Sequence, residues 1–414
     1  MTGMTDAKCR FCDAALRLSF ADLGMSPLSN AYLEREQLNR MEPFYPLHAW
    51  VCERCFLVQL EEFESPRQIF SDYAYFSSYS DSWLAHAKAY AEAMRSRLDL
   101  DGSSFVVEIA SNDGYLLQYF VAMGVPVLGI EPAANVAAEA ERKSVPTLVK
   151  FFNTHTATEL AHGGRKADLI IGNNVLAHVP QLNDFVRGLT VLLKPAGVVT
   201  MEFPHLLRLI AENQFDTIYH EHFSYFSFVV VERVFATHGL TLFDVEEIPT
   251  HGGSLRIYAR HAANERISVS PRVTRLREQE LAAGLHDPQT YRRFAEQVKR
   301  TKRGLLKFLI EAREAGKRVA GYGAPAKGNT LLNYCGVRTD LLEFTVDRSP
   351  HKQGRFLPGV HVPIFAPERI LASKPDYVLI LPWNLKDEIV GQMKEIRLWG
   401  GRFVVPIPEL NVFA

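Results

Sequence analysis

Four of the five cysteines occur as two C-x-x-C pairs, Cys9–Cys12 and Cys52–Cys55. Paired thiolates at this spacing can direct both sulfurs at one ion, and four thiolates complete the tetrahedral shell that Zn²⁺ prefers. A catalytic zinc needs an open coordination position, which four cysteines do not leave. The pairs therefore predict a structural zinc site, with four unrelated free cysteines as the alternative. The fifth, Cys335, is expected to be a small buried apolar side chain.

A buried strand that runs into a tight turn is predicted for residues 105–114, Phe-Val-Val-Glu-Ile-Ala-Ser-Asn-Asp-Gly. Such a turn brings backbone close to a nucleotide at the carboxyl edge of a parallel sheet. Glu131 ends the next apolar run, 23 residues after Glu108, where an acid can hold both ribose hydroxyls. Ala110 and Asn112 stand where dinucleotide sites carry glycine, so a pyrophosphate would fit poorly. A cofactor without phosphates, such as S-adenosylmethionine (SAM), would not need those glycines.

A third apolar run begins at Ala167 and is followed by Asn173, Asn174 and His178. Each of the three segments alone could be an ordinary packing turn of an α/β protein. In this order and spacing they resemble the class I SAM-dependent methyltransferases. The cofactor contacts expected on that basis are Glu108, Ala110, Asn112, Gly114, Tyr115, Leu116, Glu131, Pro132, Asn173 and Asn174.

Residues 219–225, Tyr-His-Glu-His-Phe-Ser-Tyr, form the densest polar and aromatic cluster of the chain. They follow an apolar run at 198–203 and a helical stretch, so they can lie over the same edge of the sheet. His220 and His222 lack the H-E-x-x-H spacing of a helical metal site and would share a face only on a strand. Because imidazole titrates near neutral pH, the cluster favours general acid–base chemistry over metal binding or a buried structural pair.

Two glycine turns occur later in the chain. Residues 250–256, Thr-His-Gly-Gly-Ser-Leu-Arg, join two strands, and the double glycine would let backbone approach a ligand. An ordinary hairpin is the alternative. Residues 319–329 follow a strand and open a helix, and their glycines and Lys327 could cradle an anion. A packing turn without a ligand is the alternative there.

An α/β scaffold must position these segments. Residues 81–100 repeat apolar side chains at helical spacing, and 270–316 read as long charged helices. The alternation of β-rich and helical runs predicts parallel sheets, except for an antiparallel pair at 241–247 and 255–260. The other expected strands are 105–109, 125–130, 169–171 and 198–203, then 318–321, 342–346, 377–381 and 403–406.

Length and charge exclude some classes of function. The 414 residues suffice for two or three domains, and 46 basic against 47 acidic residues give a net charge of −1. A near-neutral chain does not favour binding to nucleic acid or to an anionic membrane. No apolar run is long enough to span a bilayer and the start lacks a signal-peptide core, so we expect a cytoplasmic protein.

Taken together, the cysteine pairs and residues 108–114, 219–225, 251–256 and 321–329 resemble the sugar C-methyltransferases of antibiotic deoxysugar pathways. The resemblance covers essentially the whole chain. It implies a class I SAM-dependent methyltransferase core at 81–265, with a Rossmann-like sheet that ends in an antiparallel hairpin. A zinc-binding domain at 1–80 and a helical connector with a Rossmann-like α/β domain at 266–414 would flank it.

The resemblance also implies ligands and roles. The cofactors are SAM and a structural Zn²⁺, and the partner is a dTDP-linked 4-keto deoxysugar methylated on carbon 3. The sequence leaves the oligomeric state open, with a monomer as one option. His222 is the general base, Tyr219, Glu221 and His178 line the sugar site, and Tyr73 reaches in from the zinc domain; only the resemblance separates His222 from His220. Further substrate contacts are expected from Tyr75, Phe76, His220, Tyr225, His251, Ser254, Arg256, Tyr322, Lys327 and Asn329.

Carbon chemistry agrees with this set of residues. A carbon beside a ketone becomes a nucleophile when a base removes its proton and a donor stabilises the enolate oxygen. Two other functions fit parts of the sequence. An NAD-dependent nucleotide-sugar enzyme could use the C-terminal glycine turn, and hydride transfer would identify it. A non-enzymatic zinc scaffold for protein or RNA would fail to bind S-adenosylhomocysteine.

Overall fold

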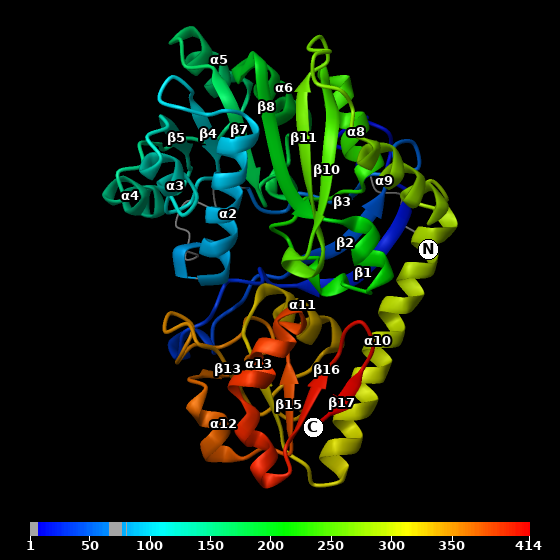
Figure 1. The fold of residues 1–414 in the computed structure, drawn as a ribbon. Helices are drawn as coiled ribbons and strands as arrows, with labels where there is room; N and C mark the ends of the chain where they lie inside the picture. The colour runs from blue at the N-terminus through cyan, green and yellow to red at the C-terminus, as the bar shows by residue number, and fades with distance from the viewer. Residues whose placement is uncertain (1–6, 66–76, 80) are drawn as a thin grey trace.

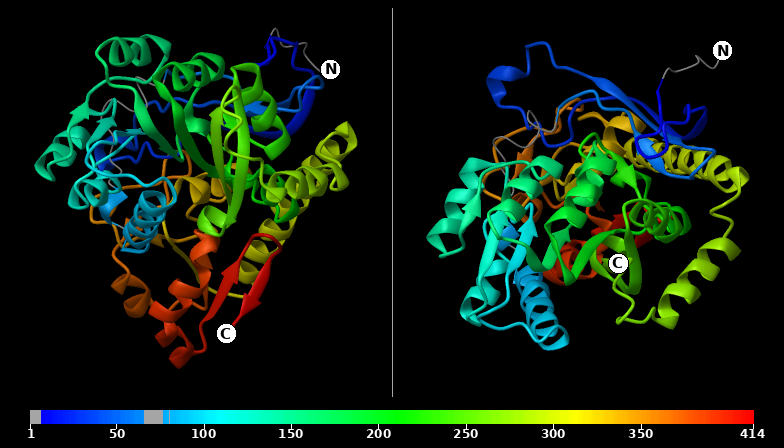
Figure 2. Two further views of the ribbon diagram at one scale, coloured as in Figure 1. Left: turned by 45° about the horizontal axis from the view of Figure 1, so that its top comes forward. Right: turned by 90° about the horizontal axis from the view of Figure 1, so that it is seen from above.

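The computed structural model describes residues 7–65, 77–79 and 81–414, and their strands form three sheets. In Figure 1 a seven-stranded sheet lies above a six-stranded C-terminal sheet. The four-stranded N-terminal sheet, whose first three strands are drawn in blue, lies behind their junction (Figure 2). The fold is α/β as expected, with a central methyltransferase-like sheet and one smaller unit on each side.

The N-terminal sheet is completed by residues from far along the chain. Its last strand, β9, consists of the last two residues of the 219–225 cluster and pairs antiparallel with β3. The N-terminal sheet contains three strands from before residue 80 and one from after it. The division of the chain into domains at residues 80 and 265 therefore stays a proposal. The strands in spatial order are β1 Leu18–Ser26, β2 Tyr45–Val51, β3 Val58–Leu60 and β9 Ser224–Tyr225.

The central sheet reverses its strand order between β4 and β7. Strands β4 to β8 are parallel, whereas β11 runs antiparallel to β8 and β10 antiparallel to β11, which confirms the expected hairpin. Ligands of such sheets bind where the order reverses, outside the carboxyl ends of the strands. The strands in spatial order are β10 Leu240–Ile248, β11 Ser254–His261, β8 Leu193–Pro204, β7 Ala167–Asn173, β4 Val106–Ile109, β5 Val127–Ile130 and β6 Thr147–Leu148.

Helices cover this sheet with apolar stripes. In α6, Leu182, Phe185, Val186 and Leu189 are buried, a spacing of three and four residues that puts them on one face. The helix α5 begins at a capping side chain, Asn153, which accepts a hydrogen bond from the backbone N–H of Thr156. The helices are α2 Asp81–Arg97, α3 Leu117–Ala122, α4 Ala134–Arg142, α5 Thr154–His162, α6 Leu182–Leu192, α7 Leu206–Ala211 and α8 Phe228–Thr237.

The long helix α10 joins the N-terminal and C-terminal sheets. It buries an apolar stripe against β1, where the ring of Phe294 stacks on that of Phe20 with centroids 4.5 Å apart. The C-terminal sheet is parallel except for β17. The β-rich runs expected between residues 318 and 406 predict the parallel strands, but not β17. Its strands in spatial order are β14 Ile364–Phe365, β13 Thr345–Val346, β12 Val319–Tyr322, β15 Tyr377–Ile380, β16 Arg402–Val405 and β17 Asn411–Phe413. The helices of this region are α9 Pro271–Ala282, α10 Pro288–Glu314, α11 Ala326–Cys335, α12 Glu368–Ser373 and α13 Lys386–Gln392.

Among the described residues, no helix is both long enough and apolar enough to cross a membrane.

Candidate active site

The two cysteine pairs meet in one cluster. Cys9 Sγ lies 3.5 Å from Cys55 Sγ, and Cys12 Sγ lies 3.4 Å from Cys52 Sγ. All four sulfur atoms lie within 4.8 Å of one another. Sulfurs at about 2.3 Å from a tetrahedral zinc would be about 3.8 Å apart, so the cluster fits the ion. Four thiolates leave no open position, so a zinc ion held by them would have a structural role.

Each pair forms the same local turn. The backbone N–H of Asp13 donates to Cys9 O, and that of Phe56 donates to Cys52 O, at 2.9 and 2.8 Å. Both residues have a left-handed φ, 60° and 63°. Gln59 Nε2 donates to Cys9 Sγ at 3.2 Å, an outer-shell hydrogen bond that stabilises a thiolate ligand. Because both pairs form the same turn, the four cysteines are suited to bind one metal ion together.

The turn after β4 keeps the conformation of a glycine turn with only one glycine. Ala110, Asn112 and Gly114 have φ of 55°, 49° and 73°. Such values cost a residue with a side chain roughly 1–2 kcal/mol. Backbone strain of this kind clusters at ligand clamps. The turn lies at the carboxyl edge of β4, beside the point where the strand order reverses.

Glu131 ties this turn to the end of β5. Its Oε2 accepts the backbone N–H of Asn112, and its Oε1 accepts that of Ala133, both at 2.9 Å. Burial raises the pKa of the Glu131 carboxyl, while these two amides oppose the rise. Each carboxylate oxygen has a second lone pair, which could accept a ribose hydroxyl.

We therefore expect Glu131→Ala to weaken SAM binding at least about tenfold, because hydrogen bonds to a charged group contribute about 1.5–3 kcal/mol each. Isothermal titration with S-adenosylhomocysteine measures the change. Glu141→Ala, an exposed acid on the neighbouring α4, is the control and should bind normally. Equal affinities in the two variants would remove Glu131 from the site.

Two polar side chains beside this turn are buried around the Tyr115 hydroxyl. Glu108 is 0% and Asn173 7% exposed, at the ends of β4 and β7. Within the part of the chain that the structure describes, their oxygen and nitrogen atoms make no hydrogen bond of standard geometry, and the Tyr115 hydroxyl is the polar group that approaches both. Leaving such groups unpaired costs about 1–3 kcal/mol each, more for a charge. A ligand with cationic and hydrogen-bonding groups would satisfy them, and the ammonium and sulfonium of SAM have that character.

The other expected cofactor residues have different surroundings. The side chains of Tyr115 and Leu116 are buried in the core, and the Tyr115 hydroxyl reaches Glu108 and Asn173. Asn174 Nδ2 lies 3.2 Å from His251 Nε2. Pro132 directly follows Glu131 and is half-buried. Trp83 at the start of α2, which the sequence did not single out, lies against the ring of Tyr115 with centroids 6.0 Å apart.

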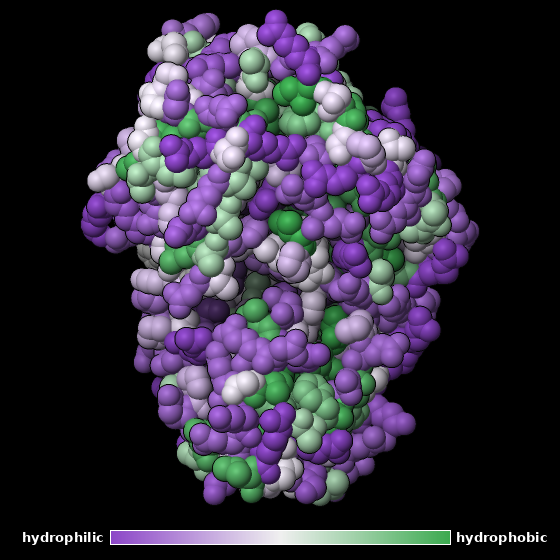
Figure 3. Space-filling view, viewed as in Figure 1, coloured by the Kyte–Doolittle hydropathy of each residue, from purple (hydrophilic) through white to green (hydrophobic). Residues whose placement is uncertain are grey.

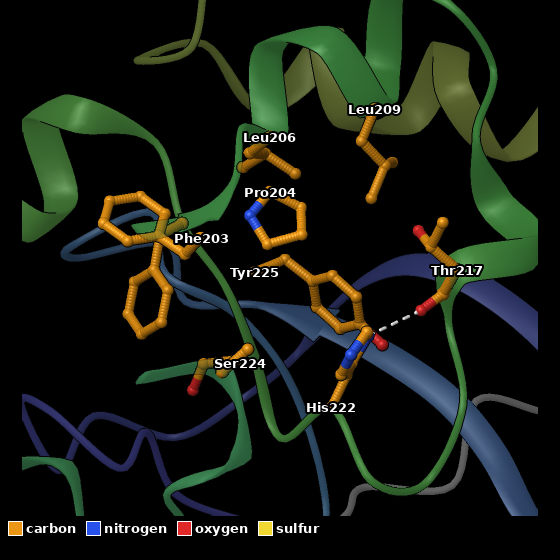
Figure 4. Close-up of a pocket in the computed structure, with 10 residues that line it drawn as sticks. Phe203, Pro204, Leu206, Leu209, Thr217, His222, Ser224 and Tyr225 are labelled. Carbon is orange, nitrogen blue, oxygen red and sulfur yellow. Dashed lines mark hydrogen bonds between the residues drawn. The ribbon is translucent and has the colours of Figure 1, made fainter. Parts of the chain in front are cut away.

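His222 lies in a cluster of aromatic rings. Its ring centroid is 4.0 Å from that of Tyr219, 4.8 Å from that of His178 and 6.1 Å from that of Tyr225. His222 Nδ1 lies 2.9 Å from Thr217 O, as Figure 4 shows. A carbonyl only accepts, so Nδ1 carries the hydrogen and Nε2 carries the lone pair of the neutral ring. Burial, followed by the neighbouring His178, lowers the pKa of His222 well below its usual value.

A small cavity lies behind this ring. Its volume is about 10 Å³, room for about one water, and Leu206, Leu209 and Tyr225 are among the residues that line it (Figure 4). A sugar cannot enter there. In the space-filling view the molecule is hollowed at mid-height, where α2, the β10–β11 hairpin and α11 approach one another (Figure 3).

His220 and His222 do not share one face, because the strand that this would require is absent at these two residues. The two lie in a turn and loop that belong to neither a strand nor a helix. His220 Nε2 lies 3.2 Å from Pro46 O, and its ring meets that of Tyr45 edge-on at 5.9 Å. His220 is therefore held by the N-terminal sheet, whereas His222 faces His178. The separation arises because backbone in a turn has no side-chain period.

Glu221 points toward the N-terminal unit. Its Oε1 accepts a hydrogen bond from Asn30 Nδ2 at 2.7 Å, and burial raises the pKa of its carboxyl. Its backbone oxygen lies 2.7 Å from His178 Nδ1 and accepts the hydrogen there. Burial lowers the pKa of His178 to about 4. His178 is thus neutral at pH 7, with the lone pair on Nε2.

The polar side chains of the 250–256 hairpin make hydrogen bonds to other groups of the protein. Ser254 Oγ donates to Thr250 O at 2.9 Å, and Arg256 Nε donates to Glu202 Oε1 at 2.7 Å. A Cβ on Gly252 would lie 2.6 Å from Trp383 Cη2, so this glycine admits an indole of the C-terminal unit. The approach of this double glycine to a ligand stays a prediction, with Trp383 filling the space beside Gly252.

The polar groups of the C-terminal glycine turn, residues 319–329, likewise make hydrogen bonds to other groups of the protein. The backbone N–H of Ala324 donates to Asp347 Oδ2 at 2.8 Å. The carboxylate of Asp347 is therefore the anion that this turn binds in the structure. Tyr322 Oη donates to Gln392 Oε1 at 2.9 Å, away from the central sheet. Lys327 Nζ donates to Asn384 Oδ1 at 2.8 Å. This pairing weakens the argument for a dinucleotide at the turn.

Asn329 is fully buried, and its Nδ2 has no hydrogen-bond partner among the described residues. Tyr73, Tyr75 and Phe76 lie outside the described residues. Sequence reasoning missed Asn30, Trp83, Asp216 and Trp383, which reach the site region only through contacts between distant segments. No motif or spacing marks them.

Three family models match the chain in succession. They are a zinc binding domain at residues 9–70, a methyltransferase domain at 83–245 and a C-methyltransferase C-terminal domain at 249–408. With the reversed strand order, the strained turn after β4 and the cysteine cluster, these matches define a SAM-dependent methyltransferase that carries a structural zinc domain.

The chain is 37% identical over 407 residues to the C-methyltransferase NovU of Streptomyces niveus, which covers 98% of this chain and 97% of NovU. It therefore belongs to the C-methyltransferase family that includes NovU. It is also 28% identical over 95 residues to a ubiquinone biosynthesis O-methyltransferase of Bartonella tribocorum, across 23% of this chain and 38% of that protein. A solved structure similar over 42% of the chain is the CcbJ methyltransferase of Streptomyces caelestis, with 89% of that chain covered, 13% identity and a TM-score of 0.35.

Proposed function

We propose that this enzyme transfers a methyl group from SAM to carbon 3′ of a dTDP-linked 4-keto deoxysugar. The observation that carries the proposal is the fixed His222 ring, whose Nδ1–H is held by Thr217 O so that Nε2 presents its lone pair. The family membership supports methylation on carbon. The motif resemblance to the C-3′-methyltransferase of D-tetronitrose biosynthesis supports the choice of position.

In this proposal His222 Nε2 removes the proton from carbon 3, beside the ketone. The lowered pKa of His222 keeps its ring neutral at pH 7, as a base must be. Bound SAM supplies an electrophilic methyl group. The buried Glu108 and Asn173 at the strand ends, with Glu131, would hold the cofactor.

The enolate oxygen needs a hydrogen-bond donor, and the geometry favours Tyr219 over His178. The neutral His178 already donates through Nδ1 to Glu221 O, so its Nε2 can only accept. A tyrosine hydroxyl is protonated at neutral pH and can donate. His178 Nε2 would instead accept a hydrogen bond from a hydroxyl or amino group of the sugar.

Mass spectrometry of a dTDP-4-keto deoxysugar incubated with enzyme and SAM tests the function. We expect one added methyl group, located on carbon 3 by NMR. A product methylated on oxygen or nitrogen, or no methylated product from any 4-keto deoxysugar offered, would contradict the proposal.

A further inference from the structure

Trp383 of the C-terminal unit contacts three separate segments near His222. It lies in the short helix η6, Trp383–Leu385, and its Nε1 donates to Asp216 Oδ2 at 2.8 Å. Lys327 Nζ lies 4.4 Å from the centroid of its ring. The hairpin tip at Gly252 packs against the ring edge, and Gln214 Nε2 donates to Gly252 O at 2.7 Å. One indole therefore joins the C-terminal unit to two segments of the central unit.

Asp216 belongs to the turn that holds the His222 ring. It is 0% exposed and lies in the short helix η4, Phe215–Thr217. The next carbonyl along the chain, Thr217 O, is the group that accepts the His222 Nδ1 hydrogen. The C-terminal unit also holds the other side of this turn, because Thr330 Oγ1 of α11 donates to Ile218 O at 3.1 Å. The carbonyl that orients His222 is thus fixed between two contacts from the C-terminal unit.

We propose that Asp216 and Trp383 are positioning residues, through which the C-terminal unit sets the orientation and tautomer of His222. This inference rests on the proposed role of His222 as the base. The carboxylate of Asp216 anchors the indole, and the anchored turn aims Thr217 O at Nδ1. A misplacement of about 1 Å in such an arrangement can cost about 10²-fold in rate.

The charges around the turn are consistent with this role. Burial raises the pKa of Asp216 to about 7, and the Lys327 ammonium and the indole hydrogen bond oppose a further rise. The titratable groups that bear on His222 are His178, His251 and Lys327, with Tyr219 and Tyr225 beside its ring. Asp216 is therefore largely protonated in the acid range where His222 titrates, so Asp216→Asn removes no charge there and acts through the geometry of the turn.

The test compares Trp383→Phe and Asp216→Asn with Trp399→Phe in the full-length enzyme. Trp399 is a matched control, because it is half-buried in the same unit and its Nε1 donates to Pro375 O at 2.9 Å, within that unit. For each variant we measure kcat, KM, affinity for S-adenosylhomocysteine, and exchange of the carbon-3 proton in D2O with S-adenosylhomocysteine bound.

We expect Trp383→Phe and Asp216→Asn to lower kcat and exchange roughly 10–100-fold, with KM and S-adenosylhomocysteine affinity within a few fold of wild type. The acid limb of the kcat profile of Asp216→Asn should keep its wild-type position, because Asp216 is already largely neutral there, and Trp399→Phe should match wild type. Wild-type kcat in both test variants would overturn the inference. So would a parallel loss of cofactor affinity and thermal stability, which would indicate a structural role. A wild-type enzyme that binds cofactor but neither exchanges nor methylates would overturn the proposed function itself.

Discussion

Replacing His222 with Asn is expected to lower turnover by about 10²–10⁴-fold, the usual contribution of a general base. The amide retains a donor near Thr217 O but has no basic nitrogen to remove the carbon-3 proton. Affinity for SAM should be unchanged, because Glu131 and the turn after β4 lie on other elements. The direct assay omits methyl transfer: with S-adenosylhomocysteine bound and the ketosugar in D2O, wild type should exchange the carbon-3 proton and the variant should not.

His220→Asn is the matched control for this experiment. His220 is bonded toward Pro46 in the N-terminal unit, so we expect its variant to exchange the proton at close to the wild-type rate. The opposite pattern, with exchange lost in His220→Asn and kept in His222→Asn, would assign the base to His220. Tyr219→Phe should also slow exchange, whereas retained exchange in that variant would point to another donor for the enolate oxygen.

Cys52→Ser is expected to abolish tight zinc binding and to destabilise the N-terminal unit. Binding of a structural zinc contributes about 10–16 kcal/mol of folding energy in small zinc domains. Loss of a direct ligand should cost more than the roughly 10–100-fold in affinity that loss of an outer-shell partner costs. Elemental analysis should find one zinc per wild-type chain, and urea unfolding should report the lost stability.

The zinc variant should also lose turnover, although the cysteines lie away from His222. Strand β3 pairs with β9, where Val58 faces Tyr225, and β9 begins two residues after His222. Cys335→Ala, in the C-terminal unit, is the control and should retain its zinc. Purified wild-type enzyme that is folded and active without zinc would contradict this prediction.

The features that the sequence determined by itself are local ones. The spacing within each C-x-x-C pair sets up one turn, so the four-cysteine cluster could be predicted without a fold. The β-rich runs lie where the strands are, because burial on both faces of a parallel sheet demands continuous apolar segments. An acid at the end of the second strand could also be predicted, because Glu131 directly follows an apolar run and lies 23 residues after Glu108.

Only the tertiary structure decided where the side chains of irregular segments point. His220 and His222 diverge because a turn has no side-chain period, and their partners come from residues 46 and 217. Arg256 proved to be an ion-pair partner of Glu202, and Gly252 makes room for Trp383. Such contacts join residues that are far apart in sequence. They depend on how whole units pack together, and no local pattern of residues records that packing.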